Sequence, residues 1–104
     1  MHTEEIESFY VNMSGELAKC ELELDTAQLE LGNRKAEALK ALYLAGAGKN
    51  DSERQAAEKA AMLSLEIQQA ENVVIRNKAC VAAAKAMQRV AEHRLRMAEV
   101  GGNG

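Results

Sequence analysis

Hydrophobic positions in the C-terminal half of the chain repeat every seven residues. One row consists mainly of alanine: Ala56, Leu63, Ala70, Asn77, Ala84, Ala91 and Ala98. A second row, four residues further on, contains Ala60, Ile67, Val74, Val81, Gln88 and Leu95. Such heptad spacing is typical of helices that supercoil around a partner. The pattern predicts one helix over about residues 52–99, with an apolar stripe widened by Val73, Cys80 and Met87.

The N-terminal half carries a matching apolar face over about residues 4–44. Its members are Ile6, Phe9, Met13, Leu17, Cys20, Leu24, Ala27, Leu31 and Ala38. Gly15 and the pair Gly32-Asn33 interrupt this face, and a glycine costs about 1 kcal/mol relative to alanine in a helix interior. We expect a mostly continuous helix, with a break at Gly15 or at Gly32 as the alternatives.

Glycine, lysine and small polar residues gather between the two segments, in the stretch LYLAGAGKNDSER from Leu42 to Arg54. A phosphate-binding loop would need a glycine at position 43 and a hydroxyl residue at position 50. Tyr43 and Asn50 occupy those positions. The stretch therefore predicts a turn over residues 45–51, in which glycine ends one helix and Asp51 or Ser52 caps the next.

Folding the chain at this turn predicts an antiparallel hairpin with large residues opposite small ones. The expected pairs are Leu24 with Val73, Leu17 with Cys80, Met13 with Ala84 and Ile6 with Ala91. Charge supports this arrangement, because residues 1–30 carry eight acids and one lysine whereas residues 73–100 carry six bases and two acids. An antiparallel hairpin places these unlike charges side by side.

Composition agrees with an all-α fold. The chain of 104 residues has no proline, no tryptophan, one phenylalanine and two tyrosines. Residues that lose little on entering a helix dominate the sequence. We expect a single helical-hairpin domain over residues 1–100, followed by a flexible tail at residues 101–104.

A second apolar row on the first helix has no place inside a two-helix hairpin. It comprises Leu22, Leu29, Ala36 and Tyr43, and the segment Ala79–Met87 of the second helix is also small or apolar nearly all round. These surfaces predict self-association of two hairpins into a four-helix bundle. The alternative is that Leu22 and Leu29 are scattered surface residues.

Residue patterns for chemistry are absent from the sequence. His2 and His93 lack metal-ligand spacing, and no serine or cysteine has a convincing histidine base. Cys20 and Cys80 are expected to be reduced core thiols. We therefore predict no catalytic residue, metal or cofactor, and a cytoplasmic protein with no membrane span that is not an enzyme.

The predicted function is a non-enzymatic protein–protein interaction module, an adaptor, chaperone or inhibitor, that pairs with itself and with an unidentified protein partner. The alternatives are a small phage-type inhibitor that uses the acidic helix against a nucleic-acid-handling enzyme, and a nucleic-acid accessory protein that uses the basic half. The net charge of −3 and the scarcity of aromatic residues disfavour nucleic-acid binding. Candidate partner-binding residues are Glu21, Glu23, Asp25, Glu30, Arg89, Arg94 and Arg96.

Overall fold

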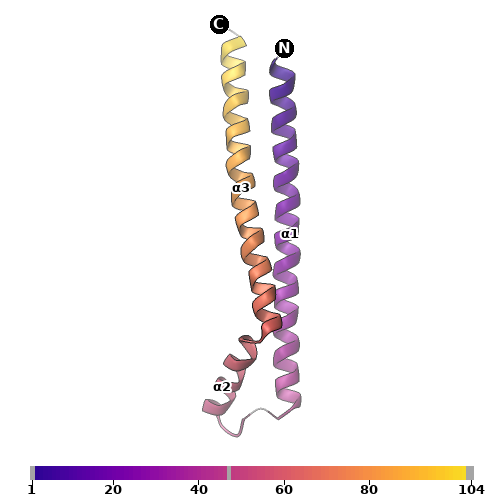
Figure 1. Cartoon of the computed structure of the whole chain (residues 1–104), viewed down its shortest axis with the longest axis vertical. Helices are drawn as coiled ribbons and strands as arrows, with labels where there is room; N and C mark the ends of the chain where they lie inside the picture. Colours follow the sequence, from indigo (N-terminus) through magenta and orange to yellow (C-terminus); the bar gives the residue numbers. More distant parts are fainter. Residues whose placement is uncertain (1, 47, 103–104) are drawn as a thin grey trace. The chain divides into compact units, whose positions relative to one another are not determined.

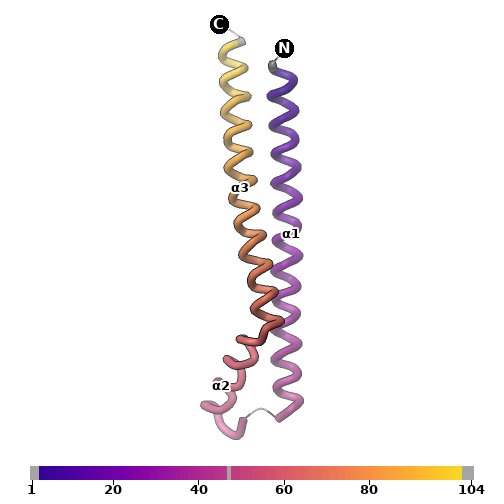
Figure 2. The backbone as a smooth tube through the Cα atoms, viewed as in Figure 1, coloured from indigo at the N-terminus to yellow at the C-terminus, as the bar shows by residue number. Residues whose placement is uncertain are grey.

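A computed structural model of the chain describes residues 2–46 and 48–102, without the side chain of His2. It contains the helices α1 (His2–Leu44), α2 (Asp51–Met62) and α3 (Leu65–Gly102), and no strand lies within the described residues (Figures 1 and 2). The predicted all-α class is confirmed. None of the three helices, over the residues described, is long and apolar enough to cross a membrane.

The chain divides into two compact units, both built from antiparallel helices. The first unit combines residues 1–24 with residues 77–104, so that the first half of α1 lies beside the later part of α3. The second unit, residues 25–76, holds the rest of α1, the turn, α2 and the start of α3. The predicted antiparallel hairpin is confirmed within each unit.

The helix α1 is unbroken. Gly15 and Gly32 both lie inside it, so the two alternative breaks are wrong. A β-carbon added at either glycine would meet nothing within 4 Å. The intrinsic cost of each glycine is therefore outweighed by the packing of the helix on its partner.

The predicted turn is confirmed, with a different capping residue. Gly46 and Gly48 have φ values of 76° and 68°, the left-handed conformation that glycine adopts without strain. The N-cap of α2 is Asn50 rather than Asp51 or Ser52, because its side chain accepts a 2.9 Å hydrogen bond from the backbone N–H of Glu53. The Glu53 carboxylate accepts in turn from the backbone N–H of Lys49 at 2.7 Å. This arrangement resembles a capping box.

The continuous second helix predicted over residues 52–99 is wrong, because the chain breaks at Leu63 and Ser64. The Ser64 hydroxyl oxygen accepts from the backbone N–H of Ile67 at 3.4 Å, as an N-cap does. The Gln68 side chain donates to the Leu63 carbonyl at 3.1 Å and so satisfies an acceptor at the end of α2. At its other end α3 continues to Gly102, into the predicted tail, while residues 103–104 lie outside the described part.

Apolar side chains meet along one face of each paired helix, which we call the seam. Its buried members are Ala27, Ile67, Val74, Val81 and Ala91. The two predicted heptad rows are confirmed from Ile67 and Ala70 onwards, where every member is buried or half-buried. Their earlier members Ala56, Ala60 and Leu63 are exposed, and α2 contributes no buried residue.

The predicted register of the hairpin is wrong. Within the first unit, the Gln88 amide donates a 3.0 Å hydrogen bond to the Ser14 hydroxyl. The predicted register would place residue 83 opposite Ser14, five residues earlier. Val73, Cys80 and Met87 are also exposed, so they do not widen the stripe as predicted.

The two kinds of glycine predict opposite effects of alanine. We expect Gly32→Ala to raise the free energy of unfolding by about 1 kcal/mol, because the helix gains propensity and the new methyl group meets open space. Gly48→Ala should lower it by at least about 1 kcal/mol, because φ is positive and the β-carbon would lie 2.7 Å from the Arg54 backbone nitrogen. Urea unfolding followed by circular dichroism at a fixed protein concentration measures both. A stabilised Gly48→Ala variant would contradict this account of the turn.

Candidate functional site

The predicted self-association residues lie on the outside of α1. Leu22 and Leu29 are 67% and 66% exposed, and Ala36 is also exposed. Successive helical residues are about 100° apart, so Leu22 points away from Cys20 and Leu24, which are half-buried on the seam side. In the first unit this surface continues with steps of three and four residues. We call it the outer α1 row: Ser8, Val11, Gly15, Ala18 and Leu22, all exposed.

Tyr43, in the second unit, already has a partner within the chain. Its hydroxyl donates a hydrogen bond to the carboxylate of Glu58 on α2. This hydrogen bond, and then the charge of Glu58, raises the pKa of the Tyr43 phenol. Tyr43 thus ties α2 to the end of α1, and the residue remains 57% exposed.

The four predicted acidic residues do not form a single face. Glu21 and Glu23 are exposed and lie on opposite sides of Leu22, because two residues correspond to about 200° of rotation. In the second unit, Glu30 forms a 2.9 Å ion pair with Arg34, which also reaches Glu66 at 3.5 Å. Glu21 and Glu23 form no ion pair with another described residue, so they frame the outer α1 row with negative charge.

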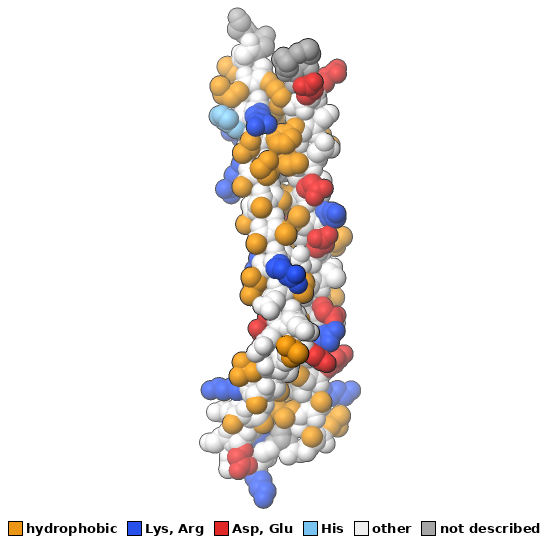
Figure 3. Space-filling model, in the orientation of Figure 1, with side chains coloured by type: hydrophobic (Ala, Val, Ile, Leu, Met, Phe, Trp, Pro, Cys, Tyr) orange, Lys and Arg blue, Asp and Glu red, His pale blue; other side chains and the backbone are white. Residues whose placement is uncertain are grey.

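The basic residues of the first unit also separate into two groups. Arg94 lies over the ring of Phe9, with 5.2 Å between the guanidinium carbon and the ring centroid, a cation–π contact across the seam. Arg89 and Arg96 are exposed and share one side of α3. Together with two lysines they form what we call the basic column: Lys78, Lys85, Arg89 and Arg96. Figure 3 shows carboxylates along α1 and bases along α3 in this unit.

A second apolar surface, on α3, is largely hidden in the sequence. Exposed residues recur there with steps of four and three, on the side of the helix opposite the seam. We call this surface the outer α3 row: Ala79, Ala83, Ala86, Val90, His93 and Met97. Half of its members are alanine. The sequence of residues 79–87 therefore indicates a helix that is apolar on all sides and does not reveal a separate row. The spacing of Val90 and Met97, seven residues apart and both exposed, is the signal that identifies it.

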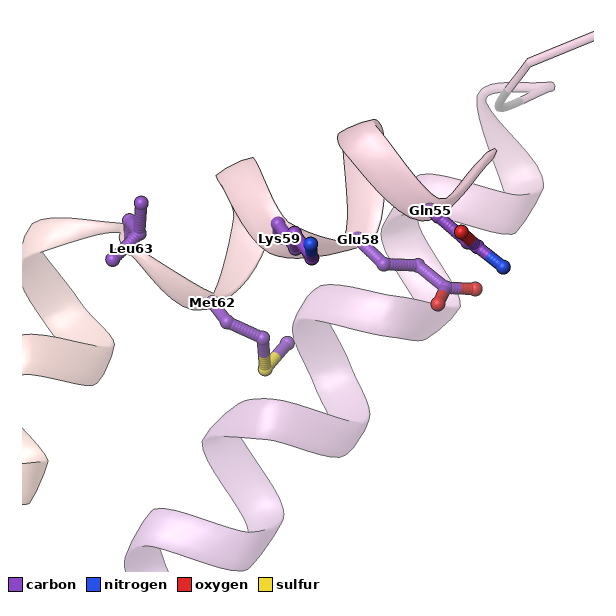
Figure 4. A pocket seen from close by; sticks show the side chains of 5 residues that line it. All are labelled: Gln55, Glu58, Lys59, Met62 and Leu63. Atoms are coloured by element: carbon purple, nitrogen blue, oxygen red, sulfur yellow. The ribbon is translucent and has the colours of Figure 1, made fainter. Parts of the chain in front are cut away.

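A hollow of about 540 Å³ lies along α2, in the second unit. It is lined by Gln55, Glu58, Lys59, Met62 and Leu63, and Figure 4 shows Met62 and Glu58 extending towards α1. The hollow exists because α2 buries no side chain completely against its neighbour. We therefore regard it as an incompletely filled contact between helices.

The two cysteines differ in exposure. Cys20 is half-buried, whereas Cys80 is exposed, so the prediction that both are core thiols is wrong for Cys80. Burial, and then the neighbouring Cys80, Glu23 and Glu16, raises the pKa of the Cys20 thiol. His93 lies on the same helix as Cys80 but about 20 Å further along its axis, too far to act as its base.

Neither metal-ligand clusters nor known relatives point to a specific chemistry. Within the described residues, no group of three or more His, Cys, Asp or Glu side chains could hold a metal ion. The side chain of His2 lies outside that part. Comparison of the chain with protein-family models, curated proteins and solved structures gave no match.

The exposure of the cysteines predicts unequal reactivity. At neutral pH we expect Cys80, studied in a Cys20→Ser variant, to react with a disulfide reagent at least several-fold faster than Cys20 in a Cys80→Ser variant. The rate for Cys20 should rise with pH into a range where an ordinary thiol is already ionised, because its pKa is raised. Absorbance of the released thiolate measures both rates. Equal rates in the folded variants would contradict the assigned exposure.

Proposed function

We propose that the protein is a non-enzymatic protein–protein interaction module that binds through the outer side of α1, as an adaptor, chaperone or inhibitor, and that it associates with itself. The observation that carries this proposal is the exposure of large apolar side chains on α1, opposite the seam. Val11 and Leu22 in the first unit are 65% and 67% exposed. A single exposed apolar side chain needs no explanation, but several on one side of a helix are typical of an interface.

The small size of the core supports the same proposal. Five hydrophobic residues are buried among those described, and two of these are alanine. A chain of this length with one narrow seam obtains little stability from burial alone. Covering the outer side of α1 with another protein chain would remove further apolar surface from water.

The acidic residues beside the outer α1 row favour a second candidate of related kind. Glu16, Glu21 and Glu23 are exposed and form no ion pair with any described residue. Unpaired carboxylates on both sides of the row would suit a basic partner surface, including the nucleic-acid groove of an enzyme, which a small phage-type inhibitor could occupy. Both candidates place the binding surface on α1. A cytoplasmic site of action fits the free thiols of Cys20 and Cys80.

Substitution on α1 tests the binding surface. We expect Leu22→Lys to weaken self-association tenfold or more, because burying a leucine contributes about 2 kcal/mol and about 1.4 kcal/mol is a factor of ten. Asn12→Lys, which adds the same charge at an exposed position beside the row, is the matched control. Leu29→Lys tests the second unit separately. Sedimentation equilibrium gives the masses, and an unchanged mass for both leucine variants, or a monomeric parent protein, would contradict self-association through α1.

A nucleic-acid function is tested by salt dependence. The basic column has four basic residues. Because so few residues can neutralise phosphates, the binding of nucleic acid should be weak, and its affinity should fall steeply as the salt concentration rises. We therefore expect no sub-micromolar binding of DNA or RNA in a gel-shift titration at about 0.15 M salt. Tight binding at that ionic strength, lost when Arg89 and Arg96 become alanine, would favour the nucleic-acid accessory protein instead.

A further inference from the structure

The first unit presents two outer surfaces with opposite charge. On α1, residues 3–24 carry six carboxylates and one lysine, and the outer α1 row runs through them. On α3, residues 77–101 carry five bases and two carboxylates, and the outer α3 row runs through these. Within the part of the chain that the structure describes, Glu16, Glu21, Arg89 and Arg96 form no ion pair. The seam therefore leaves charge on both surfaces that is not neutralised by pairing.

The two outer rows match in form as well as in charge. The outer α1 row extends over about 21 Å of helix and the outer α3 row over about 27 Å, from a rise of 1.5 Å per residue. Each contains large and small residues, with Leu22 and Val11 on one and Met97 and Val90 on the other. Gly15 has nothing within 4 Å of a β-carbon built on it, so another helix can approach α1 closely there.

We propose that the outer α1 row of one copy of the chain binds the outer α3 row of a second copy. This inference rests on the proposed function and names the partner of the α1 surface. The contact places one of the carboxylates that flank the outer α1 row, Glu21 or Glu23, near the basic column of the neighbouring copy. It repeats between chains the pairing of acidic and basic helices that the seam makes within the first unit. Two α1 surfaces placed together would instead bring like charges into contact.

The positions of the two rows determine what kind of assembly forms. Each row lies on the side of its helix opposite the seam, so the two rows of a first unit face in opposite directions. Two copies therefore cannot bind each other through both of their rows at once. The contact is heterologous: one copy uses its α1 and the next uses its α3, and the free rows at the ends can add further copies.

Complementation between two variants tests this arrangement. Leu22→Lys places a positive charge on the α1 row, against the basic α3 surface of a neighbour. Ala86→Glu places a negative charge on the α3 row, against the acidic α1 surface of a neighbour. Both residues are exposed, so the fold should persist, and circular dichroism checks this for each variant. Asn12→Lys is the control off the row.

The expected result has four parts, all measured by sedimentation velocity over a range of concentrations. The mass of the parent protein and of Asn12→Lys should rise with concentration beyond that of a dimer. Leu22→Lys alone and Ala86→Glu alone should each remain monomeric. An equal mixture of these two should form a dimer and nothing larger, because one intact α1 row and one intact α3 row remain. Raising the salt concentration should weaken this dimer at least several-fold, because its flanking charges are screened.

Several results would overturn the inference, and they separate it from the proposed function. If Ala86→Glu still self-associates while Leu22→Lys does not, α1 is the binding surface but its partner is not α3. If neither variant affects self-association, both proposals fail. If the parent protein is monomeric and its outer α3 row binds vesicles containing phosphatidylserine, with binding lost in Ala86→Glu, the base-framed row serves an anionic membrane surface instead.

Discussion

A pair of helices can bury one face of each helix against the other, and every other property of this chain depends on that limit. The seam is narrow, with Ala91 fully buried and Ile67 nearly so. Small residues on α3 let the helices approach closely, but they also bury little apolar surface. Burial within the chain therefore leaves leucine and valine side chains on the outside of α1. The interaction surfaces are thus a direct result of folding with two long helices.

Polar contacts in the seam add to this narrow core. The hydrogen bond between Gln88 and Ser14 places two polar side chains between the helices, in a row otherwise occupied by apolar residues. The contact of Arg94 with the ring of Phe9 lies further along the same unit. A half-buried polar pair is satisfied in one register and broken in others, so it discriminates between registers more sharply than alanine does. Here that discrimination matters because neighbouring alanines are interchangeable.

Much of the fold could be predicted from the sequence, and the errors have identifiable physical causes. Heptad spacing from Ile67 onwards, the glycine turn and the unlike charges of the two halves were sufficient for an all-α antiparallel hairpin. The heptad pattern was extended too far towards the N-terminus, to Ala56 and Ala60. Alanine fits a heptad position equally well whether it is buried or exposed. Ser64 followed by Glu66 is an N-cap signal within an apparently continuous heptad repeat. This signal decides the local structure, because a new helix begins there. The register then shifted because alanine gives little discrimination between alternative pairings. On the outside, Leu22 was identifiable from its size, whereas the outer α3 row was concealed by alanine.

The separate capping of α2 and α3 has a consequence for how this chain tolerates changes in length. In a continuous helix, one inserted residue rotates everything after it by about 100° and moves seam residues to the surface. Here α3 begins afresh at Ser64, whose hydroxyl and carbonyl start the new helix independently of α2. Residues 45–63 can therefore be lengthened or shortened while Ile67 and Val74 keep their positions on the seam. The tip of the chain is free to vary in evolution, or to carry an inserted segment, without disturbing the heptads that follow it.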